Sequence, residues 1–384
     1  MPTASTPAPS FITRLRRAGL SLAPVIAAAL SAAGCASSGT LTMNQRAAAV
    51  PVQNDEFAKL GYRVDWRGFP VVMNGGTIAQ FNTLGDAVGA LDSTGVFTLL
   101  DAKSGSIRWS DQPSGPLTEY HGSVRDGKTV LLASQTDTFV YDATTGTLQA
   151  KLSTPQVIST TPVVIGGLAI YGSHNGTIFG IMKSGGFQAW ATGVQGAIEE
   201  NPVRFGDTTL LAMVSRDGEV LVFDGSSGRG VGRAKIFEGP GAPLAHSDTL
   251  AFIPSTDHSL YAVTRDTAEV LWRFRTDAPL HHAPLFFNNK VLVDLGAQGV
   301  CAVDSGSGKK LWSNPDVHGD AVAIRKGKLL VFDGAKVALL DPANGVTIDT
   351  VNLKNVSMLH AETLIDGPLY AISSVGVITR LVPR

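Results

Sequence analysis

A short pattern of strand, turn and strand recurs along most of this chain. Its clearest copy is Gly299–Trp312, GVCAVDSGSGKKLW, in which apolar residues alternate before a Gly-rich turn that begins at Asp304. Alternation with a period of two is typical of a β-strand, and Asp followed by Gly is typical of a tight turn. A two-strand unit cannot bury a core alone, so such units must pack side by side. The turn position recurs at Asp101, Asp142, Met182, Asp224, Thr264, Asp304, Asp341 and Val382.

The spacing of this position is nearly constant. Neighbouring copies lie 37 to 42 residues apart, and the residues between them contain two further apolar stretches. Several stretches begin after a Pro, which is tolerated at the start of a strand because no ladder N–H is needed there. We therefore expect an all-β fold, an eight-bladed β-propeller with four antiparallel strands in each blade. The strand-opening Pro residues, expected to lead into innermost strands, are Pro162, Pro202, Pro243 and Pro284.

The two ends of the repeat array are incomplete in complementary ways. Gly61–Trp66 matches the second half of the repeat without its first half, whereas Gly376–Val382 is a first half without its second half. A ring of blades must hide its strand edges, and joining the two halves in one blade does so. We therefore predict that these two segments pair and close the ring.

All five Trp residues fall at one position of the repeat. A large aromatic side chain that recurs with the fold is expected to pack between neighbouring blades, where one Trp can bury about 200 Å². We therefore expect a packing role for these residues and not a ligand-stacking role. They are Trp66, Trp109, Trp190, Trp272 and Trp312.

The N-terminus has the features of a bacterial lipoprotein export signal. Positive charge at Arg14–Arg17 precedes the mostly apolar stretch Ala18–Leu30, which is too short for a membrane-spanning helix. Ala32–Gly34 then precede Cys35 in a sequence that resembles a lipobox, so we expect Cys35 to be lipidated. The absence of Asp after Cys35 favours the periplasmic face of the outer membrane. The expected organisation is a lipoprotein signal peptide at 1–35, a flexible tether at 36–55 and the propeller at 56–384.

The composition argues against several classes of function. The net charge is −1 and charged residues make up 16% of the chain, so no basic surface for nucleic acid is expected. The chain contains two Cys, and if Cys35 carries lipid, Cys301 has no intrachain partner. Cys and His do not occur with the spacing of a metal site. We therefore expect neither a disulfide framework nor a bound metal.

The repeat, GxxxAxDxxxGxxxW, resembles that of the pyrroloquinoline-quinone dehydrogenase-like propellers over residues 60–384. One branch of these propellers comprises the quinone-dependent alcohol dehydrogenases, and it implies adjacent Cys residues, a metal held by carboxylate and amide groups, and an Asp base. This chain has no Cys–Cys pair, and the repeat accounts for all of its Trp residues. A quinone-dependent dehydrogenase is thus the least favoured interpretation, and we expect no enzyme activity and no cofactor.

The other branch is the BamB family, lipoproteins of the outer-membrane barrel-assembly machinery. The lipobox, the short tether, the eight expected blades and the segment around Met182 are similar to that family. The resemblance implies a lipid-anchored envelope scaffold that binds protein partners through loops leading into innermost strands. The chain departs from the family at Gln156 and Val157, where the family has Leu-Arg, and at Ala197, where it has an acidic residue. The partner-binding positions expected here are the apolar pair Val157 and Ile158, as exposed anchors, and Glu199 and Glu200.

A further set of candidates is expected around one mouth of the central channel. His282 and Glu200 stand two residues before strand-opening positions, and His121 and His360 fall at or next to the equivalent position. Equivalent positions form a ring in a propeller. Such a ring could bind a small ligand or a metal, or respond to pH because His titrates near neutrality. The other interpretation of these residues is a hydrated polar rim that binds no ligand. For the protein as a whole, ligand or metal binding at the channel mouth is the alternative to the scaffold function.

Overall fold

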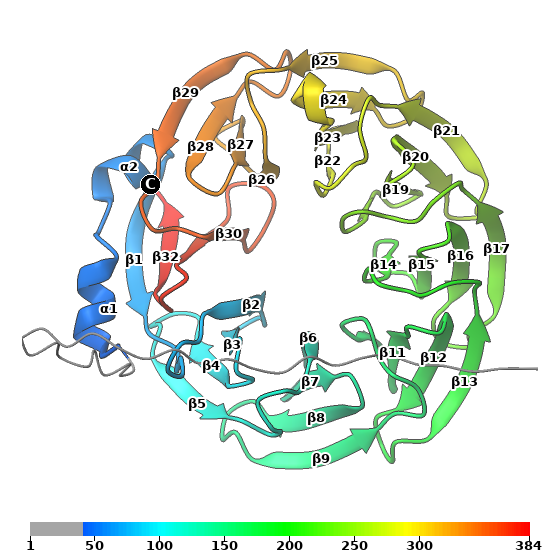
Figure 1. Ribbon diagram of the computed structural model, residues 1–384, viewed down its shortest axis with the longest axis horizontal. Helices are drawn as coiled ribbons and strands as arrows, with labels where there is room; N and C mark the ends of the chain where they lie inside the picture. Colours follow the sequence, from blue (N-terminus) through cyan, green and yellow to red (C-terminus); the bar gives the residue numbers. More distant parts are fainter. Residues whose placement is uncertain (1–40) are drawn as a thin grey trace, which may run out of the picture. The chain divides into compact units, whose positions relative to one another are not determined.

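The computed structural model describes residues 41–384, and these residues form eight four-stranded antiparallel sheets. The sheets are the blades of a ring around a central channel (Figure 1), which confirms the predicted eight-bladed propeller. Within a blade the strands run in sequence order from the innermost to the outermost, except where the two chain ends join. The strand-opening Pro residues precede the innermost strands of blades three to six, as expected.

The first four blades follow the repeat along the chain. Blade one consists of β2 (Ile78–Thr83), β3 (Ala87–Asp92), β4 (Phe97–Asp101) and β5 (Ile107–Asp111). Blade two consists of β6 (Tyr120–Asp126), β7 (Thr129–Ser134), β8 (Asp137–Asp142) and β9 (Leu148–Ser153). Blade three consists of β10 (Val163–Ile165), β11 (Leu168–Gly172), β12 (Thr177–Met182) and β13 (Gln188–Gly193). Blade four consists of β14 (Val203–Arg204), β15 (Leu210–Val214), β16 (Glu219–Asp224) and β17 (Gly230–Lys235).

The remaining four blades continue the same order and return to the start of the ring. Blade five consists of β18 (Ala245–His246), β19 (Leu250–Ser255), β20 (Ser259–Thr264) and β21 (Val270–Arg275). Blade six consists of β22 (Leu285–Phe287), β23 (Lys290–Asp294), β24 (Val300–Asp304) and β25 (Lys310–Asn314), with the short helix η1 (Gly296–Gln298) after β23. Blade seven consists of β26 (Asp320–Arg325), β27 (Lys328–Phe332), β28 (Lys336–Leu340) and β29 (Thr347–Asn352). Blade eight consists of β30 (Met358–Ala361), β31 (Leu369–Ile372), β32 (Ile378–Pro383) and β1 (Tyr62–Gly68).

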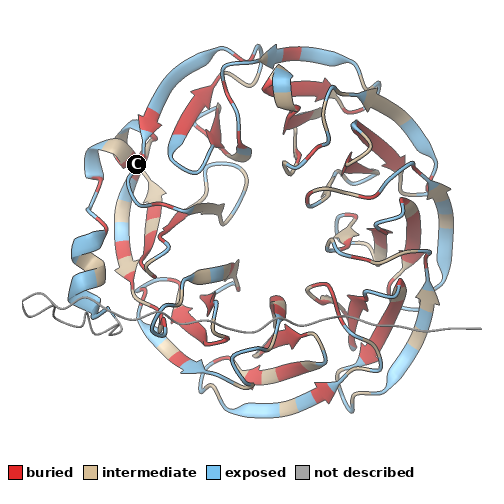
Figure 2. Ribbon diagram, in the orientation of Figure 1, coloured by how far each residue is buried: buried red, intermediate tan, exposed pale blue. Residues whose placement is uncertain are grey.

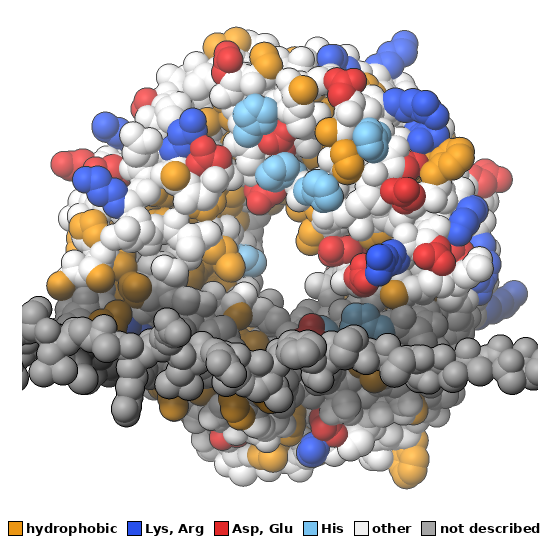
Figure 3. Space-filling view, in the orientation of Figure 1, with side chains coloured by type: hydrophobic (Ala, Val, Ile, Leu, Met, Phe, Trp, Pro, Cys, Tyr) orange, Lys and Arg blue, Asp and Glu red, His pale blue; other side chains and the backbone are white. Residues whose placement is uncertain are grey.

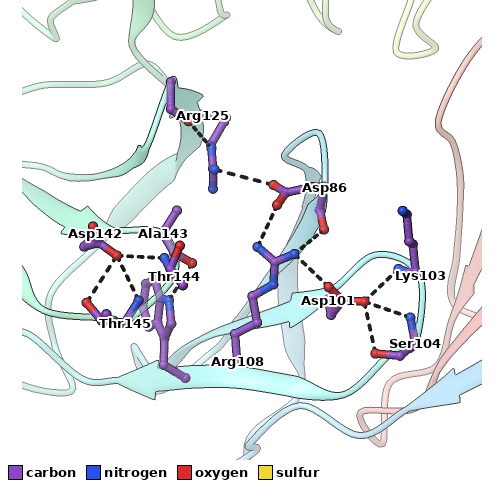
Figure 4. A network of polar contacts seen from close by, with 12 residues as sticks. Asp86, Asp101, Lys103, Ser104, Arg108, Arg125, Asp142, Ala143, Thr144 and Thr145 are labelled. Carbon is purple, nitrogen blue, oxygen red and sulfur yellow. Dashed lines mark hydrogen bonds and ion pairs between the residues drawn. The ribbon is translucent and has the colours of Figure 1, made fainter.

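The Asp residues of the repeat form the turns between third and fourth strands. The Asp101 carboxylate accepts a hydrogen bond from the Ser104 N–H (3.0 Å) and pairs with Arg108 at 2.7 Å (Figure 4). In the next blade, the Asp142 carboxylate accepts a hydrogen bond from the Thr145 N–H (2.8 Å; Figure 4). The hydrogen bond from Arg108 lowers the pKa of Asp101 to about 2, so this carboxylate is charged at neutral pH. The carboxylates of these Asp residues are therefore used in hydrogen bonds and ion pairs that stabilise the fold.

The hydrophobic core lies between neighbouring blades. Figure 2 shows the buried residues concentrated in the inner strands and the exposed residues along the outermost strands. One cluster of buried side chains combines Leu99 and Trp109 of blade one with Val130 and Tyr141 of blade two. Third strands such as β16 are buried on both faces, whereas fourth strands such as β17 alternate because one face contacts solvent. The packing of one blade on the next therefore supplies the burial that stabilises the ring.

Each Trp packs against a Gly in the third-to-fourth-strand turn of the next blade. In the pair Trp109 and Gly146, a Cβ atom on the Gly would lie 2.5 Å from Cγ of the indole. The indole N–H of Trp109 donates to the carbonyl oxygen of Ala143 in the same turn (3.2 Å). The predicted packing role is therefore confirmed. The other pairs are Trp66 with Gly105, Trp190 with Gly228, Trp272 with Gly308 and Trp312 with Gly345.

The two ends of the repeat array complete blade eight. The outermost strand β1 pairs antiparallel with β32, from Tyr62 opposite Pro383 to Gly68 opposite Ile378. β32 in turn pairs with β31, so the two ends of the repeat array share one sheet. This pairing confirms the predicted closure of the ring.

A buried Arg from the neighbouring blade holds this junction. Arg325 ends β26 of blade seven and is 7% exposed. Its Nε donates to the carbonyl oxygen of Gly61 (3.0 Å), and its Nη2 donates to that of Arg384 (2.8 Å). Its Nη1 pairs with the Asp366 carboxylate at 2.6 Å. One side chain therefore ties the start of β1 and the end of β32 to blade seven.

Residues 41–55, which we expected to belong to a flexible tether, are folded. They form α1 (Met43–Ala49) and the start of α2 (Asn54–Lys59), which lie outside the ring beside β1 (Figure 1). Arg67 of β1 donates to the carbonyl oxygens of Ala47 (3.4 Å) and Val50 (2.7 Å), and Phe57 of α2 is buried in the core. No residue of α1 itself is buried, so its sequence lacks the apolar periodicity from which a helix could be predicted.

The predicted lipidation site, Cys35, lies outside the described residues. Within residues 41–384, no helix combines the length and the apolar character that crossing a membrane requires. The lipid anchor therefore stays a prediction.

Candidate functional site

The antiparallel order of the strands gives the ring two different faces. We name the loop face the side that carries the loops leading into innermost strands, together with the turns between second and third strands. We name the turn face the opposite side, which carries the turns between third and fourth strands, including those of Asp101 and Asp142. The predicted partner-binding residues lie in two loops of the loop face, Val157 and Ile158 between β9 and β10, and Glu199 and Glu200 between β13 and β14.

Val157 and Ile158 do not form the exposed apolar pair that we expected. Val157 is 48% exposed, but Ile158 is fully buried in a core cluster that includes Tyr171. The Ile158 N–H donates to the carbonyl oxygen of Gln135 (2.8 Å), and Ile158 also forms a β-bridge with Ser173. Because the backbone is extended here, adjacent side chains point to opposite sides. Ile158 is therefore a core residue, and only Val157 of the pair is accessible to a partner.

The repeat contains a signal that could have identified Ile158 as buried. Ile158, Ile198 and Leu280 each stand four residues before a strand-opening Pro, and all three are buried. Ile198 forms a β-bridge with Ser215 just as Ile158 does with Ser173. A buried apolar residue that recurs with the period of the fold indicates packing and not recognition.

The two Glu residues of the β13–β14 loop have different environments. Glu199 is exposed, and its carboxylate lies 3.7 Å from the guanidinium of Arg216. Glu200 is partly buried, and this burial, together with the negative charge of Glu199, raises the pKa of Glu200 to about 7. Glu200 therefore changes its charge close to neutral pH, and any contact that it makes with a partner depends on pH in that range.

A groove on the loop face, which the sequence did not indicate, includes Glu199. It has a volume of about 590 Å³ and lies between the loops and turns of blades four and five. Phe237, in the loop between β17 and β18, is 73% exposed. The guanidinium carbon of Arg273 lies 4.6 Å from the centroid of the Phe237 ring, which holds the ring in place. We name this feature the blade 4–5 groove; its lining includes Glu199, Arg216, Asp217, Phe237, Glu238 and Thr256.

Two of the three predicted channel-mouth His residues are packed against separate neighbours. The ring of His121 lies edge-on to His174, with centroids 6.5 Å apart, and burial lowers the pKa of His121. The ring of His360 lies edge-on to Phe81, and burial lowers the pKa of His360 as well. Neither contacts His282, so the expected ring does not form one ligand set. Across residues 41–384, no group of three or more His, Cys, Asp or Glu side chains is arranged to hold a metal ion.

His282 belongs to a polar cluster around the buried Asp294. Its Nδ1 lies 2.9 Å from the Asp320 carboxylate, and its Nε2 lies 3.7 Å from the Asp294 carboxylate. Nδ1 of His318 lies 3.2 Å from Asp294. A cavity of about 440 Å³ opens beside these residues. Figure 3 shows His and acidic side chains gathered over the part of the ring that contains β22 and β26, beside the channel.

Sequence reasoning missed Asp294 and His318, although the repeat marks the first of them. The equivalent position in other blades is occupied by Ser134, Ser173 and Ser215, whose hydroxyl oxygens accept hydrogen bonds from the turn after the second strand. One oxygen is enough to accept the hydrogen bond from this turn, and the Asp294 carboxylate has a second oxygen that can accept another. A carboxylate in place of a hydroxyl at a buried repeat position therefore indicates an additional partner, here His318.

Comparisons with known proteins agree with this architecture. A family model described as outer membrane protein assembly factor BamB matches residues 92–240 and 216–377. The crystal structure of BamB from Moraxella catarrhalis is 20% identical, with a TM-score of 0.65, and the match covers 79% of this chain and 93% of that chain. The comparison with curated proteins found no match.

Two other solved structures are similar to this chain at lower identity. The computationally designed Ika8 protein is 14% identical, with a TM-score of 0.67, and the match covers 83% of this chain and 99% of that chain. The C-terminal WD40 domain of Sif2 is 14% identical, with a TM-score of 0.63 and the same coverage of 83% and 99%. At these identities the structural likeness shows the propeller fold alone.

Proposed function

The chain belongs to the family of the outer membrane protein assembly factor BamB, and we propose that it is a scaffold in outer-membrane protein assembly. In this role it binds a protein partner through its loop face and catalyses no reaction. Lipid on Cys35 holds it at the periplasmic face of the outer membrane. Family membership supports the scaffold role, and the sequence, which has no adjacent Cys residues, supports the non-catalytic part of the proposal.

The observation that carries this proposal is the exposed aromatic ring in the blade 4–5 groove. Aromatic side chains are enriched at the energetic centres of protein interfaces. Covering the Phe237 ring with a partner removes apolar surface from water, which stabilises a complex by about 2 kcal/mol. Arg273 already restricts the ring, so little side-chain entropy is lost when a partner binds.

The charges around Phe237 indicate the chemistry of the partner. Glu199, Asp217 and Glu238 line the groove, and the contact of Arg216 with Glu199 offsets one of these three carboxylates. The groove is therefore negative at neutral pH. It favours a partner segment in which an apolar residue is flanked by Lys or Arg, and the rate of its association should fall as salt is added.

The turn face offers less for recognition than the loop face. The carboxylates of Asp101, Asp142 and Asp304 accept hydrogen bonds from their own turns. The turns are short, and their backbone geometry restricts which residues they accept. These constraints support the loop face as the binding surface.

A crosslinking pull-down from membranes tests the loop-face assignment. We expect Phe237→Ser and Glu199→Lys each to reduce partner capture, Phe237→Ser by about tenfold or more. Phe187→Ser is the matched control, because Phe187 is also 73% exposed but lies in the β12–β13 turn of the turn face. If Phe187→Ser reduces capture and Phe237→Ser does not, the assigned face is wrong. Each variant should unfold at the temperature of the unchanged protein, so that loss of capture reports binding.

The anchoring part of the proposal has its own test. Cys35→Ser should move the protein from the membrane to the soluble periplasmic fraction. Mass spectrometry of the membrane form should identify acylated Cys35 as the first residue. An intact Ala33–Ala36 peptide in that form would contradict lipidation without affecting the loop-face assignment.

A further inference from the structure

A pocket at the channel mouth combines a charged end with an apolar wall. It is the cavity of about 440 Å³ beside His282, and it lies on the loop face where blades six, seven and eight meet. This position is separate from the blade 4–5 groove, so a ligand could bind here whether or not a partner binds to that groove. We name it the mouth pocket. The residues that matter for its chemistry are His282, His318, Asp320, Val322, Met358 and Leu359.

His282 lies between two carboxylates. Its Nδ1 is 2.9 Å from Asp320, and its Nε2 is 3.7 Å from Asp294. A neutral imidazole has one N–H and would turn a lone pair toward one of these carboxylates, whereas an imidazolium has an N–H for each. The hydrogen bond with Asp320 raises the pKa of His282 accordingly. The protonated ring is thus a cation built into the pocket.

The carboxylates of Asp294 and Asp320 differ in the number of hydrogen bonds that they accept from the protein. Asp294 is 3% exposed, and its oxygens accept hydrogen bonds from the N–H groups of Gly296 (3.0 Å) and Gly319 (2.8 Å) and from His318. Asp320 is exposed, and within the described part of the chain its carboxylate contacts His282 alone. When His282 loses its proton, Asp320 therefore loses its counter-charge, whereas Asp294 keeps its hydrogen bonds.

The remaining charged groups around the pocket do not supply a replacement cation for Asp320. The Asp333 carboxylate accepts hydrogen bonds from the N–H groups of Ala335 and Lys336, and the Lys336 ammonium lies 3.6 Å from that same carboxylate. His318 contacts Asp294. The charge left at the mouth is therefore negative once His282 is neutral.

Another part of the pocket lining is apolar. Val322 on β26 and Met358 and Leu359 on β30 line it, and each of these side chains is half-buried. Half-buried apolar side chains can still lose water-accessible surface when a ligand covers them. The pocket thus suits a molecule that has a positive group at one end and an apolar stem.

We propose that the mouth pocket binds an organic cation, an ammonium or guanidinium group on an apolar stem, with Asp320 as its counter-ion and protonated His282 as its internal competitor. The ligand cation takes the place beside Asp320 that the imidazolium otherwise occupies. Binding therefore strengthens as the pH rises and His282 loses its proton. A free amine and a basic side chain of a peptide share this chemistry.

Calorimetric titration of the full chain tests the proposal with three probes. Phenethylamine represents a free amine, N-acetyl-arginine amide represents a peptide side chain, and phenethyl alcohol is the uncharged control. We expect at least one of the two cations to bind more tightly at about pH 8 than at about pH 5.5, and the alcohol to bind more weakly than that cation. The tighter of the two cations identifies the source of the ligand. Equal binding of the alcohol, or cation binding that weakens with rising pH, would overturn the proposal.

Two variants and one control separate binding from folding. Asp320→Asn should weaken cation binding by about tenfold or more, because it removes the counter-ion. His282→Gln keeps Asp320 and removes the competing charge, so binding should become nearly independent of pH. Asp316→Asn should bind like the unchanged protein, because Asp316 is an exposed residue of the loop between β25 and β26 and does not line the pocket. Unchanged affinity in Asp320→Asn, or an unchanged pH profile in His282→Gln, would overturn the proposal.

Discussion

The indole of Trp109 in blade one covers Gly146 in blade two so closely that a side chain at position 146 would overlap the ring. A Cβ atom there would lie 2.5 Å from Cγ of Trp109, and Gly146 also has a φ of +73°. The Trp and the Gly of the repeat are therefore required for the same contact, because the Trp ring fills the space that the side chain of any residue other than Gly would occupy. Four further Trp–Gly pairs repeat this contact around the ring.

Gly146→Ala should lower the free energy of unfolding by about 2–4 kcal/mol. About 1–2 kcal/mol arises from the left-handed backbone, and the rest arises from displacement of the Trp109 ring. Gly127→Ala is the matched control, since Gly127 has a φ of +55° and no atom lies within 4 Å of the place that a Cβ atom would take there. Gly127→Ala should lose only the backbone contribution, about 1–2 kcal/mol, when both variants are measured by urea denaturation. Equal losses in the two variants would show that the contact with Trp109 adds nothing.

Trp312→Phe should destabilise the propeller more than Trp190→Phe does. The indole N–H of Trp312 donates to the carbonyl oxygen of Pro342 (3.1 Å), whereas the buried indole N–H of Trp190 has no hydrogen-bond partner among the described residues. Both changes remove similar apolar surface, but only the first removes a hydrogen bond. The expected difference is about 1 kcal/mol or somewhat more in chemical denaturation. A larger loss in Trp190→Phe would contradict this assignment.

The period of the sequence predicted most of the fold, because the features that repeat are those on which blade packing depends. The turn at Asp304, the pairing of Trp312 with Gly345 and the closure by β1 and β32 each depend on residues at fixed repeat positions. The helix α1 could not be predicted from an apolar face, because none of its residues is buried. Hydrogen bonds from Arg67 to the backbone at Ala47 and Val50 attach it to the ring instead.

The candidate sites were less predictable, because most of their contacts are made once in the ring and do not recur with the repeat. Ile158 follows an exposed Val157. The only sequence signal of its burial is the apolar residue at the equivalent position of two other blades, Ile198 and Leu280. Phe237 is notable because its side chain is exposed, and the residues next to it in the sequence do not predict this exposure. His282 meets Asp320 from the next blade across 38 positions of sequence, a contact that spacing within one repeat cannot predict.

Arg325→Met should destabilise the closure of the ring. The change removes the donor to the carbonyl oxygen of Arg384 and the ion pair with Asp366. Among the described residues, the carbonyl oxygen of Gly61 then keeps only the N–H of Arg384 as its donor (3.0 Å), and Asp366 keeps only the N–H of Lys326 (2.9 Å). We expect the free energy of unfolding to fall by about 2–4 kcal/mol, because three hydrogen bonds from the buried guanidinium, one of them to a carboxylate, are lost. Hydrogen exchange should accelerate first in β1 and β32.

Arg265→Met is the control for this prediction, because Arg265 pairs with Asp266 on the surface. It should leave both stability and exchange unchanged. Deleting residues 376–384 should have a stronger effect than Arg325→Met, since it exposes two strand edges as well as apolar faces. If Arg325→Met unfolds like the unchanged protein, the junction is held by strand pairing alone.

Glu200→Gln should stabilise the protein at alkaline pH and leave it unchanged at acidic pH. Burial, with a contribution from Glu199, raises the pKa of Glu200 from its ordinary value of 4.5 to about 7. Below about pH 4.5 the carboxyl is protonated in both the folded and unfolded chains, so it adds no pH dependence. As the pH rises toward 7, the folded chain keeps a proton that the unfolded chain releases, and stability is lost. Above pH 7 the folded protein contains a partly buried charge.

The Gln variant has no proton to lose, so its advantage should grow from zero near pH 4 to about 1–2 kcal/mol at pH 8, after allowance for the partial exposure of Glu200. Urea denaturation across this range measures the difference. NMR titration of the Glu200 carboxyl provides an independent check, and Glu199→Gln should lower the pKa of Glu200 because it removes the neighbouring charge. An advantage that is the same at pH 4 and pH 8 would mean that Glu200 is not the group that titrates.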